Sequence, residues 1–332
     1  MNKTELLKRT GIIGQYAGIT PFRYTDGKAD GVDAFRVKTG SGLEFTVLRD
    51  RALDLYEATY KGVNLALFSR NGLVSPAFFE AHGFSSVMAG GMMFTSGLRN
   101  VGKSGTINGE YYPTHGRMHC TPANGSYAKT DWLDENTLHF EIGGEMHDGT
   151  FLKSLLLKRK IETAMDSNEI IITDIVENPE CVPQDFAILY HINMGYPFID
   201  ENTEVLIDAP HTVHPRGEFS AQTISDHKQF APPSELHERN YRFDIEPDSD
   251  GMTTVKVENK KLGLGMYVKA RKDTLPYTNE WKSVFPGIYT LAIEPLNNTL
   301  HGIETEKANL TMPSIKPYES IEHKVIIGVY EL

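Results

Sequence analysis

Three short stretches of the chain bring titratable residues into otherwise apolar sequence. One is residues 190–197 (YHINMGYP), in which His191, Asn193 and Gly195 alternate with apolar residues. Alternate residues of a strand face the same side, so His191 and Asn193, beside the gap at Gly195, would form a surface able to hydrogen-bond a polyol. A histidine that only packs in the core gives the same pattern, and the residues alone leave both interpretations open.

A second stretch, residues 289–295 (YTLAIEP), is an apolar strand that ends in the carboxylate of Glu294. Pro295 follows directly and would end the ladder of hydrogen bonds. Burial of Glu294 would raise its pKa toward that of a useful base, whereas an arginine neighbour would keep the carboxylate ionised as a structural ion pair. Glu294 is therefore a candidate general base.

The third stretch, residues 114–119 (THGRMH), would place His115, Arg117 and His119 on one face if the segment is extended. Gly116 would leave room for close approach. A solvated loop with incidental histidines is the alternative interpretation. His115 and His119 also have a spacing that binds zinc from a helix, but Gly116 argues against a helix, so we expect no metal site.

The elements that must position these stretches have the patterns of strands and turns. Segments rich in β-branched and aromatic residues are separated by Asn-Gly and Asp-Gly pairs, which favour hairpin turns. The predicted strands include residues 43–48, 138–142, 169–176, 253–257 and 325–330. The turn pairs begin at Asp26, Asp30, Asn71, Asn108, Asn124, Asp148 and Asp250.

The order of these elements predicts an all-β protein. Residues 155–164 and 169–177 predict an antiparallel hairpin closed by a short polar turn. Helices are expected only over residues 3–9 and 75–81. Because no repeated βαβ pattern and no Ser/Gly-rich or Pro-rich linker is present, we expect one large antiparallel β domain over residues 1–332.

Residues 97–104 (GLRNVGKS) fit the phosphate-binding pattern G-x-x-x-x-G-K-[ST] completely. Such a loop needs a helix that begins at its Lys-Ser end, because the helix N-terminus supplies the anion site. Gly105 and the turn pair Asn108-Gly109 follow at once, so no helix is expected there. We therefore reject nucleotide hydrolysis as the function.

Composition excludes several classes of partner. The chain has 332 residues, with 33 Lys and Arg against 44 Asp and Glu, so its formal net charge is −11. This balance argues against nucleic acid and anionic membranes as partners. The first ten residues lack the apolar core of a signal peptide, so we expect a cytoplasmic location. Cys120 and Cys181 lack CxxC spacing, and two buried thiols are expected.

Taken in chain order, the motifs His-Gly at 115–116, His-x-Asn-x-Gly-x-Pro at 191–197 and Ile-Glu-Pro at 293–295 resemble the aldose 1-epimerase (galactose mutarotase) superfamily over nearly the whole chain. A bacterial aldose-epimerase-like branch without assigned substrates is similar at residues 48–54, 96–102, 115–117, 190–197 and 291–295. The resemblance implies a large antiparallel β-sandwich with few short helices. It also implies a carbohydrate cleft on the concave face of a sheet. Residues 97–104 would then be a loop of this family and not a phosphate-binding loop.

The resemblance implies roles for individual residues. His191 matches the family's general acid, Glu294 its general base, and His115 the second histidine, which holds the sugar ring and its hydroxyls. The family also places an arginine against the sugar, for which Arg51 and Arg117 are the two candidates.

Two further residues are expected to bind substrate. Asn193 occupies a site position peculiar to the bacterial branch. Trp281, just before the Glu294 strand, would stack on a sugar face, although packing in the core explains a tryptophan there equally well.

The implied activity is interconversion of the α and β anomers of a sugar, with no cofactor and with a small-molecule carbohydrate as the partner. Glu294 would be ionised and His191 cationic. One alternative is a non-catalytic carbohydrate-binding or sensing protein. Another is an isomerase or lyase that uses the same acid–base pair on a modified sugar or uronate, with Arg51, Arg99 or Arg117 in the cleft. The oligomeric state stays open, and a homodimer is compatible with the sequence.

Overall fold

Two large antiparallel sheets contain most strands of the computed structural model, which describes residues 1–151, 153–235 and 238–332. The 11-stranded sheet has the order β1-β2-β3-β4-β8-β16-β23-β22-β19-β18, with β5 paired to β4. Its strands are β1 (Gly18–Arg23), β2 (Asp33–Lys38), β3 (Leu43–Leu48), β4 (Asp54–Tyr60), β5 (Val63–Asn64), β8 (Met93–Leu98), β16 (Ala187–Gly195), β18 (His211–Pro215), β19 (Arg239–Ile245), β22 (Tyr277–Phe285) and β23 (Ile288–Leu296).

The second sheet has eight strands in the order β11-β12-β13-β14-β25-β21-β20-β17. They are β11 (Asn124–Trp132), β12 (Leu138–Thr150), β13 (Lys153–Ala164), β14 (Glu169–Glu177), β17 (Thr203–Leu206), β20 (Met252–Asn259), β21 (Leu264–Arg271) and β25 (Ser320–Glu331). Three two-stranded ribbons pair β6 (Leu67–Phe68) with β7 (Gly90–Gly91), β9 (Gly105–Ile107) with β10 (Glu110–Tyr112), and β15 (Gln184–Asp185) with β24 (Ser314–Ile315).

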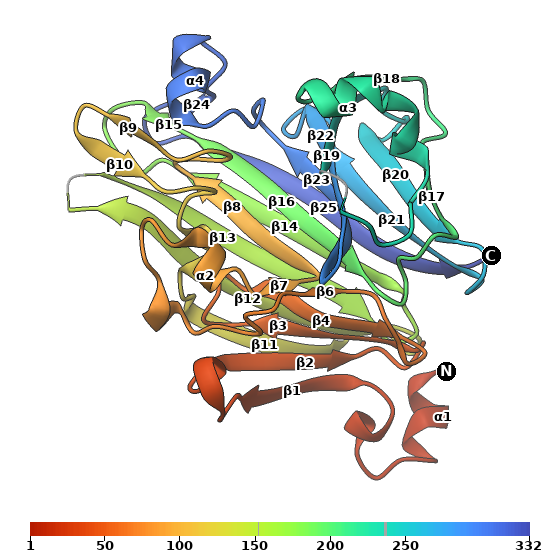
Figure 1. Ribbon diagram of the computed structural model, residues 1–332. Coiled ribbons are helices and arrows are strands. Elements are labelled where there is room, and N and C mark those ends of the chain that lie inside the picture. Colours follow the sequence, from red (N-terminus) through yellow and green to blue (C-terminus); the bar gives the residue numbers. More distant parts are fainter. Residues whose placement is uncertain (152, 236–237) are drawn as a thin grey trace.

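The helices are short and lie outside the sheets (Figure 1). The α-helices are α1 (Lys3–Leu7), α2 (Phe84–Val87), α3 (Glu218–Gln222) and α4 (Ile303–Ala308). The 3-10 turns are η1 (Ile13–Gln15), η2 (Gly27–Ala29), η3 (Pro76–Phe78), η4 (Met118–Cys120) and η5 (Ile224–Lys228). Among the described residues, no helix combines the length and the apolar character needed to cross a lipid bilayer.

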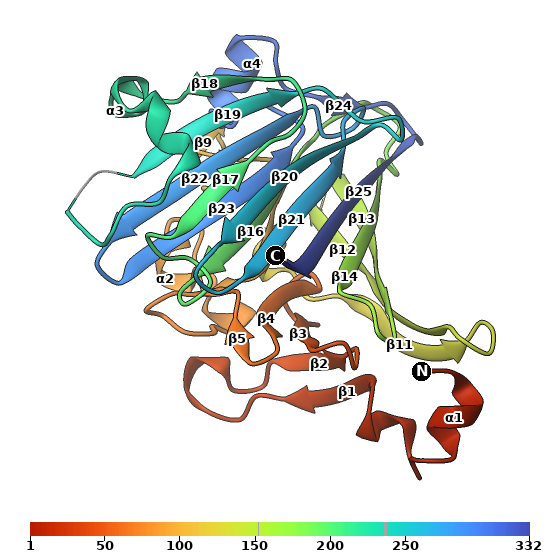
Figure 2. The ribbon, with the colours of Figure 1, turned by 90° about the vertical axis from the view of Figure 1, so that its right-hand side faces the viewer.

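The two sheets pack face to face over one large core, as the two views of the ribbon show (Figure 1, Figure 2). In β16, for example, Tyr190, Ile192 and Met194 point into this core, together with Val257 of β20 and Ile327 of β25. The intervening residues of β16 therefore point to the opposite face of the 11-stranded sheet, away from the second sheet.

A buried ionic network links the two sheets directly behind β16. Arg159 of β13 donates to Asp54 of β4 at 2.9 Å and to both carboxylate oxygens of Asp174 of β14 at 2.9 and 2.7 Å. The hydroxyl of Tyr190 also donates to Asp174, at 2.8 Å. Each charge is thus paired and hydrogen-bonded, which is the condition under which buried charges are tolerated.

Most predictions of the elements are confirmed. All five strand segments fall within strands, and β3 matches its prediction at both ends. The hairpin of residues 155–164 and 169–177 is β13 paired antiparallel with β14. The Asn108-Gly109 turn joins β9 to β10, with φ values of 51° and 81°. No helix follows the phosphate-loop-like string, because β9 begins at Gly105.

Five predictions were wrong. Asn124-Gly125 begins β11 and is not a turn between strands. Pro295 does not end the ladder, because β23 continues to Leu296 and pairs with β22 over Pro295 and Leu296. Asp148-Gly149 lies within β12, and the buried Asp148 carboxylate accepts from the backbone N–H of Leu98 at 2.7 Å. The helix predicted over residues 75–81 is only the 3-10 turn η3, because Ser75 and Pro76 start a single turn that then becomes extended at Phe79. Cys120 is buried as expected, but Cys181 is exposed.

Candidate functional site

The register between two central strands brings His191 and Glu294 together. In the antiparallel pair β16–β23, Ile192 lies opposite Ile293, so the preceding residue His191 lies across from Glu294. Residues that face each other across antiparallel strands share one face of the sheet. Nε2 of His191 lies 3.1 Å from Oε1 of Glu294, and both side chains are buried.

The same row of the sheet supplies a neighbour on each side of this pair. Phe94 of β8 lies opposite His191, and its ring stacks on the imidazole with 4.4 Å between ring centres. Asn279 of β22 lies opposite Glu294, and its amide donates to Oε2 at 3.0 Å. The carboxyl group is therefore held at both oxygens, by His191 on one side and by Asn279 on the other.

A cavity of about 620 Å³ opens over this row. Such a volume is typical of sites for small molecules. Its lining includes His115, His191, Glu294 and Trp281, four of the residues that the sequence assigned to the site.

His115 reaches the cavity from a tight loop. Its backbone has a φ of 58°, and the following Gly116 packs so closely that a Cβ atom there would lie 2.2 Å from the carbonyl oxygen of Gly97. Only glycine fits this approach. Nδ1 of His115 and Oγ of Ser96 share a hydrogen bond of 3.0 Å, and the ring centre lies 6.1 Å from that of His191.

Trp281 forms a second wall, since its ring centre lies 5.7 Å from that of His191. The indole N–H donates to Glu238 at 2.7 Å. Trp281 lies opposite Asn240 of β19, and the backbone N–H of Arg216 donates to the carbonyl oxygen of Asn240 at 2.8 Å. Asn240 and Arg216 also line the cavity, so a second polar row runs beside the first.

Burial changes the protonation of the central pair. It raises the pKa of Glu294 to about 8, against the opposing effects of the Asn279 hydrogen bond and the Arg216 charge. Burial also lowers the pKa of His191 to about 3, with a further contribution from the neighbouring His115. Both shifts favour neutral groups. The expected cationic His191 beside ionised Glu294 is thus not the resting form, although the pair still holds one proton between these two pKa values.

Arg51 and Arg117, the two arginines expected against the sugar, are not among the residues that line this cavity. Arg51 is buried and donates to the backbone carbonyl oxygens of Val74 and Val87, so it ties the segment before α2 to the last residue of that helix. Arg117 lines a separate small pocket with Arg99 and Asp148. The arginine at the cavity is Arg216, which lies in the connection between β18 and α3.

Asn193 also lies outside the cavity lining, although it is on the same face as His191. Its fully buried amide donates to the carbonyl oxygens of Gly91 and His191, at 3.1 and 3.0 Å. The short ribbon strand β7 covers it. Asn193 therefore fixes the backbone beside His191 and is not part of the cavity wall.

Asn279, Asn240 and Arg216 are the site residues that the sequence analysis missed. Asn279 alternates with Trp281 in the segment TNEW, and this spacing alone would have put both side chains on one face. Arg216 has a weaker signal, a cation within the His-Pro-Arg-Gly segment before a short helix. Its proximity to Glu294 depends on the pairing of distant strands.

Solved structures show the same fold. A protein from Klebsiella pneumoniae subsp. pneumoniae MGH 78578 described as a "putative aldose 1-epimerase" superposes with a TM-score of 0.89 at 20% identity, covering 100% of this chain and 87% of that chain. A galactose mutarotase-like protein from Clostridium acetobutylicum gives 0.64 at 14% identity, covering 96% and 100%. A galactose 1-epimerase from Lactobacillus acidophilus NCFM gives 0.59 at 12% identity, covering 95% and 99%.

These similarities confirm the galactose mutarotase-like β-sandwich that the sequence motifs implied. None of the curated proteins compared with the chain matches it. The family model described as "Domain of unknown function (DUF4432)" matches residues 29–329, and the chain belongs to that family.

Proposed function

We propose that this protein is an aldose 1-epimerase-like enzyme that interconverts the α and β anomers of a sugar. The observation that supports this proposal is the contact between Glu294 and His191, two buried titratable groups that meet at the wall of a cavity. An acid and a base within hydrogen-bonding distance of one ligand are the requirement for general acid–base catalysis.

Anomer exchange needs one proton acceptor and one proton donor. Glu294 takes the proton of the anomeric hydroxyl while His191 protonates the ring oxygen, so that the bond between the ring oxygen and C1 breaks and the open-chain aldehyde forms. Rotation about the bond from C1 to C2 and reversal of both transfers close the ring as the other anomer. The pair holds one proton, and this number suits the exchange. When the ring opens, His191 gives up a proton and Glu294 takes one, and when the ring closes both groups return to their starting forms.

Other residues prepare the carboxyl group for its role as base. Asn279 donates to Oε2 of Glu294, and Arg216 places a positive charge nearby. Both favour the ionised form of Glu294 and so oppose the effect of burial on its pKa. They therefore stabilise the carboxylate when His191 carries the proton. His115, neutral because burial lowers its pKa to about 4, is left as a hydrogen-bonding group for sugar hydroxyls.

The test is anomer exchange, measured by NMR saturation transfer on a panel of neutral, deoxy and acidic aldoses. The wild type is compared with Glu294→Gln, which keeps the size of the side chain and an oxygen for the Asn279 amide. We expect the wild type to accelerate exchange of at least one sugar and the variant to lose about 100-fold or more. Thermal stabilisation by a sugar without any acceleration by the wild type would contradict the proposal and indicate a binding protein.

A further inference from the structure

The row that carries the acid–base pair continues beyond it across two more strands. Asn279 lies opposite Arg242 of β19, and Arg242 lies opposite His214 of β18. These side chains share the face of Glu294. Because neighbouring strands are about 4.8 Å apart, the backbone of Arg242 lies roughly 10 Å from that of Glu294.

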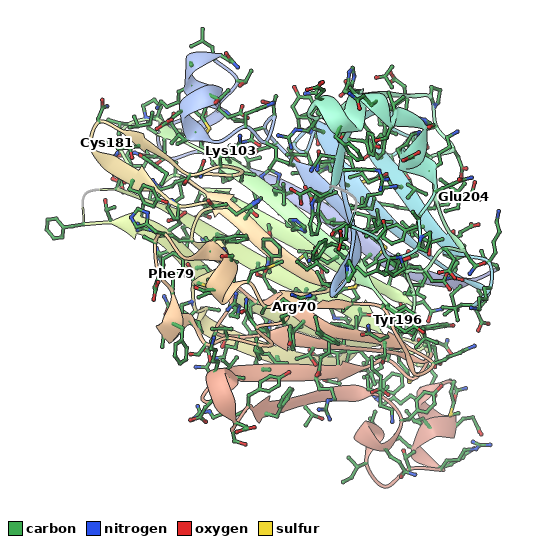
Figure 3. The ribbon with its side chains drawn as sticks, in the orientation of Figure 1. Arg70, Phe79, Lys103, Cys181, Tyr196 and Glu204 are labelled. Carbon is green, nitrogen blue, oxygen red and sulfur yellow. The ribbon has the colours of Figure 1, made fainter. Side chains whose placement is uncertain are left out.

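A second cavity of about 560 Å³ covers this end of the row. It is continuous in lining with the first, since both include Lys103, Arg216, Asn240 and Leu300. Figure 3 shows Lys103 below α4, in the loop after β8 whose sequence resembles a phosphate-binding loop.

The lining of this second cavity is strongly cationic. It contains Lys103, Arg216 and Arg242 together with two histidines, His214 and His301, and no described aspartate or glutamate. The chain as a whole has a net charge of −11, so this cluster is not part of a generally basic surface. A positively charged cavity in a protein of negative net charge indicates an anionic ligand.

Lys103 is exposed and Arg216 and Arg242 are half-buried, and none of the three forms an ion pair with a described carboxylate. Nη2 of Arg216 donates only to the backbone carbonyl oxygen of Leu300, at 2.8 Å, and its buried Nε has no partner. Nε of Arg242 is also buried without a partner, and the guanidinium lies over the Tyr277 ring at 5.0 Å.

Carboxylates near the two cavities are already engaged. Asp244 pairs with His214 at 3.0 Å, Glu238 accepts from Trp281, and Glu306 accepts from Thr299 and from the backbone N–H of His301. Burial lowers the pKa of Arg216, against the opposing charges of Glu294 and Glu306, and repulsion by Arg242 lowers it further. An anion between the two guanidinium groups would remove that repulsion.

We propose that the second cavity binds the acidic group of the substrate, so that the substrate is an anionic sugar with a phosphate, carboxylate or sulfonate remote from its anomeric carbon. This inference rests on the proposed function for the position of the anomeric carbon at Glu294. The acidic group then lies between Arg216 and Arg242, within reach of Lys103. Arginine pairs favour such oxyanions because each guanidinium donates two parallel hydrogen bonds.

The test compares glucose, glucose 6-phosphate, glucuronate and a 6-sulfonated glucose in the wild type, in Arg242→Gln and in Arg271→Gln. Arg271 lies on β21 of the other sheet in an exposed ion pair with Glu322, so its variant controls for loss of a positive charge. Anomer exchange and thermal stabilisation are measured for each sugar. The sugar that responds most strongly distinguishes the three acidic groups.

We expect the wild type to exchange at least one anionic sugar with a kcat/KM about 10-fold or more above that for glucose. Arg242→Gln should lose about 10- to 100-fold for that sugar, the effect of a charge-assisted hydrogen bond, and less than about 3-fold for glucose. Arg271→Gln should match the wild type. Equal or better exchange of glucose by the wild type, or equal losses for both sugars in Arg242→Gln, would overturn the inference.

The binding measurement separates this inference from the proposed function. Stabilisation by an anionic sugar that is lost in Arg242→Gln, without exchange of any sugar, would refute the epimerase and leave the anion site standing. Exchange of glucose with no stabilisation by any anionic sugar would support the epimerase and refute the anion site.

Discussion

Oε1 of Glu294 lies 3.1 Å from Nε2 of His191, and the two residues face each other across neighbouring antiparallel strands. Their positions are therefore fixed by the hydrogen-bond ladder of the sheet and not by a flexible loop. A ladder of this kind holds two groups with the precision that proton transfer needs.

The pH dependence of the reaction follows from the raised pKa of Glu294. With that pKa at about 8 and the pKa of His191 at about 3, the pair carries one proton throughout the range between them. We expect kcat/KM to be constant from about pH 5 to 7 and to fall above about pH 8, because the pair then loses its only proton. A decline that already begins near pH 6.5 would contradict this assignment.

Replacing Glu294 by Gln should stabilise the protein near neutral pH. In the unfolded chain the carboxyl ionises at its ordinary pKa of 4.5, whereas the native state keeps the proton up to about pH 8. Between these values the native state binds more protons, so stability falls as pH rises, by at most about 3 kcal/mol at pH 7. Glutamine cannot ionise and avoids this loss.

Urea unfolding of wild type and Glu294→Gln at pH 5 and pH 7.5 measures this effect. The advantage of the variant should be clearly larger at pH 7.5. A difference that is the same at both pH values would mean that the carboxyl of Glu294 titrates normally in the folded protein.

Asn279 is a positioning residue, and its role can be tested through the pH profile. Asn279→Ala removes the donor to Oε2 of Glu294, a bond that favours the ionised form. The pKa of Glu294 should rise further, which moves the alkaline decline of kcat/KM to higher pH and lowers kcat by about 10-fold. If kcat falls while the alkaline limb stays in place, Asn279 supports only the fold.

The buried network behind β16 should control stability. Arg159→Met leaves the carboxylates of Asp54 and Asp174 without their cation, which should cost about 3–5 kcal/mol of unfolding free energy. Lys158→Met is the matched control, because Lys158 is the neighbouring residue in β13 and its ion pair with Glu177 is partly exposed. Its effect should stay below about 1 kcal/mol in the same denaturant titration. Equal effects of the two variants would contradict this role of the network.

The local sequence predicts what depends on alternation and turns. It places His191 on the polar face of a strand and Glu294 in another, and both strands form, although the second continues past Glu294 to Leu296. The turn predicted at Asp148-Gly149 is absent because the buried Asp148 accepts a hydrogen bond from the N–H of Leu98. Turn propensity cannot reveal such a tertiary partner.

The arginine that lines the cavity could not be predicted in the same way. Arg51 and Arg117 lie close in sequence to recognisable motifs, but their side chains serve loop carbonyls and a separate pocket. Arg216 is brought to the cavity by the pairing of β18 with β19 and of β19 with β22. Register between segments so far apart in the chain is decided by the packing of the whole sheet.

The order of strands in the sheet separates the proposed acid–base pair from the proposed anion-binding residues. Glu294 and His191 belong to β23 and β16 in the middle of the described sheet, whereas Arg242 belongs to β19, next to the edge strand β18, and Arg216 directly follows β18. Substitutions at the margin disturb fewer neighbours than substitutions in the interior. On the proposed function, we therefore expect that substrate preference can be re-engineered at β18 and β19 while the acid–base pair on β16 and β23 is kept.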